Sequence, residues 1–296
     1  MPVLEIKNLS KKYGPIKALD NLNLTIEAGN IYGLLGPNGS GKTTTLGIIL
    51  GILKADQGSY KWFDGDWTSS PNLKIGAILE TPNFVPNLNA VENLEIVAAI
   101  KGKENPDIDG LLELVNLAHR KKSSFNTYSL GMKQRLAIAA TLISDPELVI
   151  FDEPTNGLDP QGIAEVRSIL TKIAASGRTV LLASHLLNEV EKICTHVAII
   201  KNGRLLAQGP IDNILSNTIT IVLQSENKEE LISWIQRTPW ITDMREVLNK
   251  IECHITPEIT PSLVNKTAFE NGIILSHFEV RKSNLEKEFL QITKGK

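Results

Sequence analysis

Residues 36–43 read Gly36-Pro37-Asn38-Gly39-Ser40-Gly41-Lys42-Thr43, and this stretch decides the fold of the chain. The apolar run 31–35 before it predicts a buried strand, and residues 44–50 after it predict a helix. A strand, a glycine-rich loop and a helix form the setting that a phosphate-binding loop requires. The alternative is a tight strand-to-helix turn with a surface lysine, and the complete pattern in its required setting favours the phosphate site.

The residue types in this loop match the chemistry of a bound triphosphate. Glycines allow successive backbone N–H groups to turn inward around a β-phosphate. The start of the following helix adds unpaired donors and a partial positive charge. We expect Lys42 to reach the β- and γ-phosphates, and the Thr43 hydroxyl to bind Mg²⁺.

A second motif lies at residues 148–153, where an apolar strand ends in two carboxylates. Ligands of open α/β sheets bind at the carboxyl ends of the strands. Asp152 is therefore a candidate Mg²⁺ partner for Thr43, and Glu153 is a candidate for polarising the attacking water. The alternative is a pair of solvated acids at a strand end.

Three further residues are candidates whose structural roles stay open on sequence grounds. Tyr13, in a loop between two strands, could stack on a nucleotide base or pack on a neighbouring strand. Ser129, with a glycine close behind it, could present donors to an anion or could simply cap a helix. His185 follows the apolar strand 179–183, so it could lie near the γ-phosphate or be structural.

Composition limits the possible classes of protein. The 296 residues suffice for one large domain and a small one, and 42% hydrophobic and 22% charged residues are ordinary values for a soluble globular protein. A net charge of −2 gives no sign of the basic surface of a nucleic-acid-binding protein. Cys194 and Cys253 have neither metal-ligand spacing nor a disulfide framework, which suits a reducing, cytosolic setting. No apolar run reaches the roughly 18 residues of a membrane span.

The rest of the chain divides into an antiparallel start, a helical block and a distinct C-terminal part. Residues 3–29 alternate as antiparallel strands do, and apolar spacing predicts helices between 89 and 117 and again up to Leu142. Residues 217–296 predict a small α+β unit with strands at 219–223, 250–255 and 273–280 and helices at 228–236, 261–271 and 285–292. Its aromatic residues are expected to form its core: Trp234, Trp240, Phe269, Phe278 and Phe289.

The order of these motifs resembles that of the nucleotide-binding subunits of ABC transporters over residues 1–216. Residues 36–43 match Walker A, 148–152 match Walker B, 156–159 match the Asn-Gly-Leu-Asp segment, and His185 matches the switch histidine. The resemblance implies an α/β P-loop NTPase of ABC type with a mixed sheet core, an antiparallel β subdomain and a helical subdomain at about 84–145. Residues 217–296 would then be a small α+β accessory domain.

The resemblance also implies roles for individual residues. ATP and Mg²⁺ are the implied cofactors, with Glu153 and His185 as catalytic residues and with Thr43, Asp152 and Glu80 as metal ligands. Ser129 and Gly131 would meet the γ-phosphate of ATP held by a second subunit. The implied ATP-binding residues are Tyr13, Gly36, Pro37, Asn38, Gly39, Ser40, Gly41, Lys42, Thr43, Thr44, Ser129, Gly131 and Asp159.

Two departures from the family pattern refine the resemblance. The signature segment, usually Leu-Ser-Gly-Gly-Gln, reads Tyr-Ser-Leu-Gly-Met at 128–132, and Glu80 stands where a glutamine is usual. A carboxylate can bind Mg²⁺ or its water but cannot donate a hydrogen bond. These features are similar to those of the peptide-antibiotic exporters of the bacitracin-resistance and lantibiotic-immunity type.

The implied function is ATP hydrolysis that powers export through a separate polytopic membrane permease. The chain would act as a homodimer, peripheral to the cytoplasmic face of the membrane, with no nucleic-acid partner. One alternative is a soluble ABC ATPase acting on ribosomes or DNA, but the chain has one nucleotide-binding domain and 36–131 is too short for a coiled coil. A monomeric P-loop kinase or GTPase would not explain Ser129 and Gly131 ahead of Walker B, nor His185.

Overall fold

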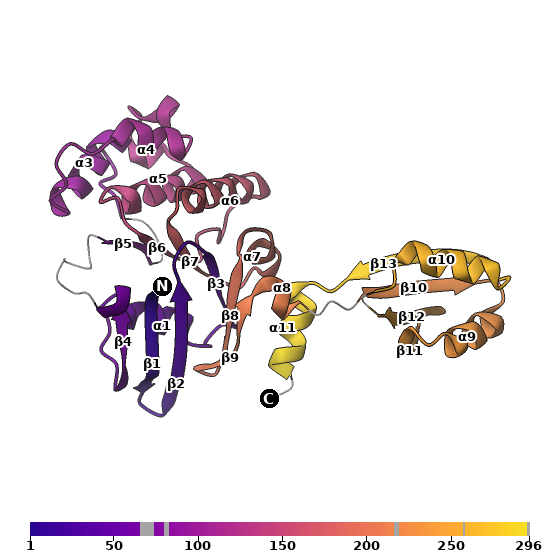
Figure 1. Ribbon diagram of the computed structural model, residues 1–296. Helices are drawn as coiled ribbons and strands as arrows, with labels where there is room; N and C mark the ends of the chain where they lie inside the picture. The colour runs from indigo at the N-terminus through magenta and orange to yellow at the C-terminus, as the bar shows by residue number, and fades with distance from the viewer. Residues whose placement is uncertain (66–73, 80–82, 216–218, 257, 295–296) are drawn as a thin grey trace. The chain divides into compact units, whose positions relative to one another are not determined.

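The protein is described by a computed structural model that covers residues 1–65, 74–79, 83–215, 219–256 and 258–294. The chain forms two compact units, Met1–Ile211 and Asp212–Lys294. Each unit has its own sheet structure and its own helices (Figure 1). No helix among the described residues has the length and apolar character needed to span a bilayer.

A six-stranded mixed sheet forms the centre of the first unit. Its order is β5-β6-β7-β3-β8-β9; all pairs are parallel except the hairpin β8–β9. Strands β3, β6 and β7 are buried along their whole length, as expected for parallel strands covered on both faces. Their carboxyl ends therefore meet at one edge. The bounds are β3 Ile31–Leu35, β5 Ile75–Ile78, β6 Leu148–Asp152, β7 Thr179–Ser184, β8 His196–Lys201 and β9 Arg204–Pro210.

A separate antiparallel sheet is formed by β1 (Pro2–Tyr13), β2 (Ile16–Glu27) and β4 (Gln57–Trp62), in the order β2-β1-β4. The alternation of Leu22, Leu24 and Ile26 is confirmed, because all three are buried while their neighbours are more exposed. These side chains share one hydrophobic core with those of β3 and of the helix that follows the glycine-rich loop.

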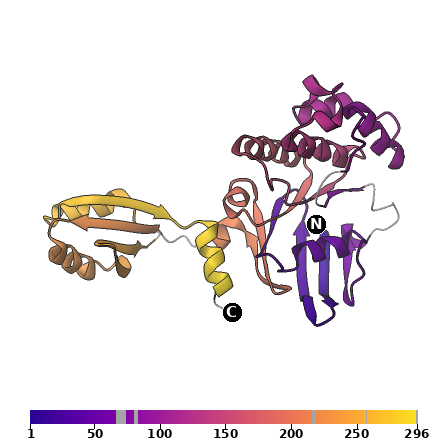
Figure 2. The same ribbon diagram turned by 180° about the vertical axis from the view of Figure 1, so that it is seen from behind.

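Three helices, α3, α4 and α5, gather at one end of the first unit, away from the antiparallel sheet, in both views (Figures 1 and 2). Asn89 and Glu92 form a reciprocal capping box at the start of α3, and Pro106 lies between α3 and α4. The bounds are α1 Lys42–Ile49, α3 Ala90–Ile100, α4 Ile108–Leu114, α5 Leu130–Leu142, α6 Pro160–Ala175 and α7 Leu187–Ile193; the short α8, Ile211–Ile214, follows β9.

Buried Arg135 on α5 links this group of helices to α6 through hydrogen bonds and an ion pair. Its guanidinium donates to the carbonyl oxygens of Val115 (3.2 Å) and Asn116 (3.0 Å), just beyond α4. It also pairs with Glu165 of α6 at 3.3 Å. A buried guanidinium is tolerated because its donors are satisfied in this way.

The second unit has the order β-α-β-β-α-β, followed by a closing helix. The antiparallel sheet has the order β11-β12-β10-β13, which is the ferredoxin-like arrangement. Its apolar face includes Ile221, Ile251 and Cys253. The bounds are β10 Ile219–Ser225, α9 Lys228–Arg237, β11 Ile241–Val247, β12 Lys250–Ile255, α10 Pro261–Glu270, β13 Leu275–Lys282 and α11 Leu285–Lys294.

Two sequence expectations for this unit need correction. Strand β11 was not predicted, because every residue of it except Ile241 is exposed and no apolar alternation marks it. Phe269 is not a core residue, since 72% of its surface is exposed on α10. Trp234 is buried in the core as expected, and Trp240 and Phe278 pack against it.

Both cysteines have buried thiols. Burial raises the pKa of both groups above the ordinary value, that of Cys253 to about 12. Because the thiolate is the reactive form, these are inert core residues.

Candidate functional site

The glycine-rich loop 36–43 connects β3 to α1 at the carboxyl edge of the central sheet. A Cβ on Gly36 would lie 2.3 Å from the Ile200 carbonyl oxygen, so only glycine fits there. Gly41 begins the helix at φ 107°, a conformation that L side chains rarely adopt. The glycine positions are therefore required by close backbone approach as well as by the turn.

The side chains of the loop form a cradle suited to an anion. Lys42 is 7% exposed, and its Nζ donates to the carbonyl oxygens of Gly36 (2.8 Å) and Pro37 (3.5 Å). The buried hydroxyl of Ser40 has no hydrogen-bond partner among the described residues. A buried ammonium beside an unsatisfied hydroxyl and a helix N-terminus fits a polyphosphate.

The turn of the β8–β9 hairpin hydrogen-bonds to this loop. This contact was not predicted from the sequence. Asn202 and Gly203 both have positive φ, as a two-residue hairpin turn requires. The Gly203 N–H donates to the Ser40 carbonyl at 2.9 Å, and the Gly203 carbonyl accepts from the Asp20 N–H at 3.0 Å. An Asn-Gly pair is a local signal for a hairpin turn, but its contact with the loop joins segments some 160 residues apart.

Thr43 and Asp152 meet where β3 and β6 end. The Thr43 hydroxyl donates to Asp152 Oδ2 at 3.0 Å, and Asp152 is 6% exposed. A hydroxyl and a carboxylate are the oxygen ligands that Mg²⁺ prefers. Glu80, the third predicted metal ligand, lies outside the described residues.

Glu153 and His185 form a second pair beside the first. His185 Nδ1 lies 2.8 Å from Glu153 Oε2, and the Glu153 N–H donates to the Ala183 carbonyl at 2.9 Å. Glu153 has φ 50°, a strained value for a non-glycine residue. Such strain is typical of functional positions that the surroundings hold in place. The bond to β7 and the bond to His185 fix the direction of this carboxylate.

Tyr13, Ser129 and Gly131 belong to other elements than the loop, whereas Thr44 follows it directly. Tyr13 ends β1 with 45% of its surface exposed and with Lys11 Nζ 5.7 Å from its ring centroid. Ser129 caps α5 by accepting from the Met132 N–H at 3.3 Å, and Gly131 follows in the first turn. Within the described chain no hydrogen bond joins Ser129 or Gly131 to residues 36–43. Thr44 lies in the first turn of α1.

Asp159 caps the N-terminus of α6, a role that was not predicted from the sequence. Its Oδ1 accepts from the Gly162 N–H at 2.8 Å, and Pro160 occupies the first position of α6. The signal was present, because an acid followed by proline is typical of a helix start. This carboxylate oxygen is therefore already engaged within its own chain.

We expect Asp159→Ala to lower the free energy of unfolding by about 1 kcal/mol, because the capping bond is lost. Asp159→Asn retains an accepting oxygen and is the matched control. Urea unfolding followed by circular dichroism measures both. Equal destabilisation by the two variants would contradict the capping role.

A phosphate-binding loop at the edge of a parallel sheet, with a threonine–aspartate pair and a glutamate–histidine pair beside it, defines a P-loop nucleoside triphosphatase. The family model described as "ABC transporter" matches residues 19–156. The bacitracin transport ATP-binding protein BcrA of Bacillus licheniformis is 37% identical over 99% of this chain and 98% of its own length. The lantibiotic transport ATP-binding protein SrtF of Streptococcus pyogenes is 39% identical over 78% of this chain and 96% of its own.

Among solved structures, the ATP-binding cassette MJ0796, in a dimeric post-hydrolysis state bound to ADP and phosphate, has a TM-score of 0.61 and 28% identity. The match covers 70% of this chain and 98% of that one. The chain belongs to the ATP-binding proteins of ABC transporters, a family of ATPases whose members pair with membrane permease components. The predicted family and fold are thereby confirmed, and these relatives give no support to the ribosome or DNA alternative.

Proposed function

We propose that this chain hydrolyses Mg²⁺-bound ATP at the interface of two copies and so powers export through a separate polytopic permease. The observation that carries this proposal is the 3.0 Å contact of Thr43 with buried Asp152 at the ends of β3 and β6, next to a loop that holds the buried ammonium of Lys42. In this scheme the loop residues Gly36, Pro37, Asn38, Gly39, Ser40, Gly41, Lys42, Thr43 and Thr44 bind the phosphates, and Tyr13 stacks on the adenine.

Thr43, Asp152 and Glu80 are the proposed ligands of Mg²⁺, which when bound neutralises charge on the β- and γ-phosphate oxygens. Glu153 accepts a proton from the attacking water, and His185 holds that carboxylate through the 2.8 Å contact. The contact fixes the carboxylate before the reaction, so little reorganisation is needed during it.

Ser129 and Gly131 are proposed to close the site of the opposite copy. In this chain they begin α5 and do not hydrogen-bond to their own phosphate loop among the described residues, which leaves the exposed Ser129 available to a partner. ATP then bridges two chains, and its hydrolysis removes the bridge. The dimeric solved cassette supports this assembly. Asp159, at the start of α6, would lie near the same interface.

The proposed cargo is a peptide antibiotic or a similar amphiphile, because the relatives with high coverage are named for bacitracin and lantibiotic transport. The chain would act at the cytoplasmic face of the membrane, as a peripheral subunit. Residues 1–216 would be the nucleotide-binding domain, with its helical subdomain at about 84–145, and 217–296 an accessory domain.

The export proposal is tested in a sensitive bacterial host that expresses this chain with the permease from a neighbouring reading frame. We expect the minimal inhibitory concentration of bacitracin or of a lantibiotic to rise several-fold. The same pair with Glu153→Gln is the control and should give no protection. If the native pair protects against neither class of peptide, the proposed cargo is wrong, whereas the rate of ATP hydrolysis by the purified chain bears on the ATPase proposal alone.

A further inference from the structure

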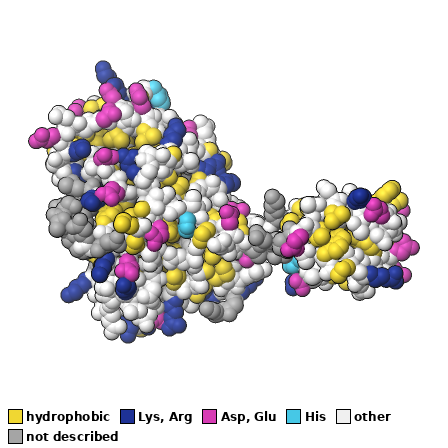
Figure 3. Space-filling model, in the orientation of Figure 1, with side chains coloured by type: hydrophobic (Ala, Val, Ile, Leu, Met, Phe, Trp, Pro, Cys, Tyr) yellow, Lys and Arg dark blue, Asp and Glu magenta, His cyan; other side chains and the backbone are white. Residues whose placement is uncertain are grey.

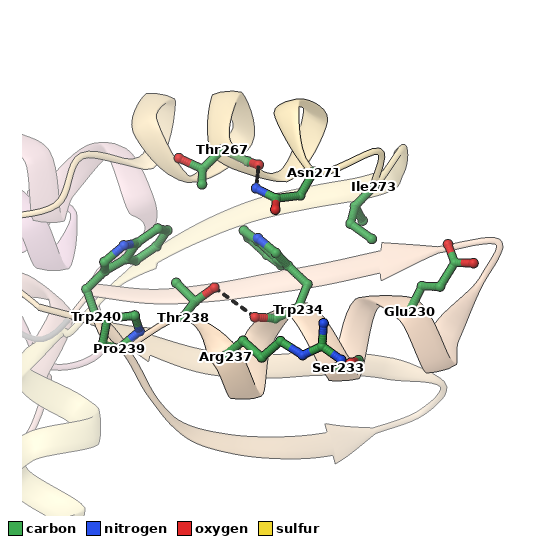
Figure 4. A pocket seen from close by; sticks show the side chains of 10 residues that line it. All are labelled: Glu230, Ser233, Trp234, Arg237, Thr238, Pro239, Trp240, Thr267, Asn271 and Ile273. Carbon is green, nitrogen blue, oxygen red and sulfur yellow. Dashed lines mark hydrogen bonds between the residues drawn. The ribbon is translucent and has the colours of Figure 1, made fainter.

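A cleft of about 530 Å³ lies between α9 and α10, wholly within the second unit. Figure 4 shows α10 above it and α9 below it, with Trp240 and Glu230 toward opposite ends. Clefts that bind small molecules commonly have volumes of about 300–1,000 Å³. The nucleotide site does not use this cleft, and no residue of it belongs to the motifs that identified the family.

One part of the cleft is apolar. The rings of Trp234 and Trp240 lie edge to face, with centroids 6.3 Å apart and planes at 80°. Trp234 is anchored in the core and is 7% exposed, and Ile273 adds an aliphatic wall. Figure 3 shows hydrophobic side chains gathered on one face of the second unit. Such a surface favours an aromatic or aliphatic side chain.

The rest of the cleft carries two charges of opposite sign. Glu230, Ser233 and Arg237 follow one another at intervals of three and four, so they share one face of α9. Among the described residues neither Glu230 nor Arg237 has an ion-pair partner. Their α-carbons are separated by about 10 Å along the helix axis, at a rise of about 1.5 Å per residue.

Polar groups between these charges can pair with a peptide backbone. Asn271 Nδ2 donates to the Thr267 carbonyl at 2.8 Å, which leaves the Asn271 side-chain oxygen as an acceptor toward the cleft. Figure 4 shows the Arg237 side chain running along α9 toward Ser233, whose hydroxyl can donate or accept.

We propose that this cleft binds a short zwitterionic peptide with an apolar side chain. Its ammonium group lies at Glu230, its carboxylate lies at Arg237, and its apolar side chain packs against Trp234 and Trp240. An extended chain spans about 3.3–3.6 Å per residue, and the Arg237 side chain runs toward Ser233 in Figure 4, so two or three residues can bridge two charges whose α-carbons are about 10 Å apart. The proposal concerns the second unit alone and does not depend on the proposed cargo.

The test is isothermal titration calorimetry of the full chain with the tripeptide Leu-Phe-Leu. The peptide contains no tryptophan, so a change in the protein's tryptophan emission reports the same event. We expect saturable binding, weakened about tenfold or more when the peptide termini are acetylated and amidated, because each charged hydrogen bond is then lost.

Arg237→Gln and Glu230→Gln are expected to weaken binding to a similar degree. The matched controls are Arg245→Gln on β11 and Glu229→Gln on α9, which change the same charges outside the cleft and should leave affinity unchanged. Equal far-UV circular dichroism and thermal unfolding of all four variants verify that the second unit stays folded. The proposal is overturned if millimolar peptide gives neither heat nor a fluorescence change. It is also overturned if the blocked peptide binds equally well, or if Arg237→Gln has no effect.

Discussion

Glu153→Gln is expected to lower the steady-state rate of ATP hydrolysis at least about 100-fold, the usual contribution of a positioned general base. The glutamine side chain occupies nearly the same volume but cannot accept a proton from water. Glu153 lies beside Asp152 and is held by both the Ala183 carbonyl and His185, so the change removes basicity with little loss of geometry. Phosphate release from purified protein, with or without the permease, measures the effect.

ATP affinity should be retained in this variant, because Glu153 does not belong to the phosphate loop. Glu147→Gln is the matched control, since Glu147 pairs with Lys74 at 3.0 Å outside the site. Its turnover should equal that of the native chain. Native turnover in Glu153→Gln would exclude Glu153 as the base.

Lys42→Met is the second replacement with a large expected effect. The buried ammonium is held in the loop at 2.8 Å from the Gly36 carbonyl, ready to exchange this bond for phosphate oxygens. A hydrogen bond to a charged group contributes about 1.5–3 kcal/mol, which corresponds to a loss of roughly 10- to 150-fold in ATP affinity. Methionine fills similar space without charge, so the loop should keep its shape.

Calorimetric titration with ATP measures the affinity, and exposed Lys54, replaced by methionine, is the control. Lys54→Met should bind ATP as the native chain does. If Lys42→Met retained native affinity, the loop 36–43 would not be the triphosphate site.

The sequence predicted those parts of the site that lie within short continuous stretches. The loop 36–43 and the acids at 152 and 153 were predicted because each motif is a short local pattern at the end of an apolar strand. The Glu153–His185 contact and the contact of Gly203 with the loop join distant segments, and they depend on strand order that no local pattern contains. The Asp159 cap was overlooked although its signal was local.

In the second unit, the wrong or missing predictions concern residues that are exposed to solvent. Strand β11 lies at a sheet edge with one buried residue, so it lacks the alternation that marks half-buried strands. Phe269 was assigned to the core from residue type alone, yet its helix presents it to solvent. The cleft between α9 and α10 depends on the packing of the two helices and could not be predicted from their sequences.

The central claim is that two copies enclose ATP and that each completes the site of the other. It is tested most directly by light scattering of Glu153→Gln protein saturated with Mg²⁺ and ATP. We expect a molar mass of twice that of one chain. Without nucleotide, or in the double variant that also carries Ser129→Arg, we expect the molar mass of a single chain. A mass that remains that of one chain at saturating ATP, even with the permease present in a lipid membrane, would contradict the account.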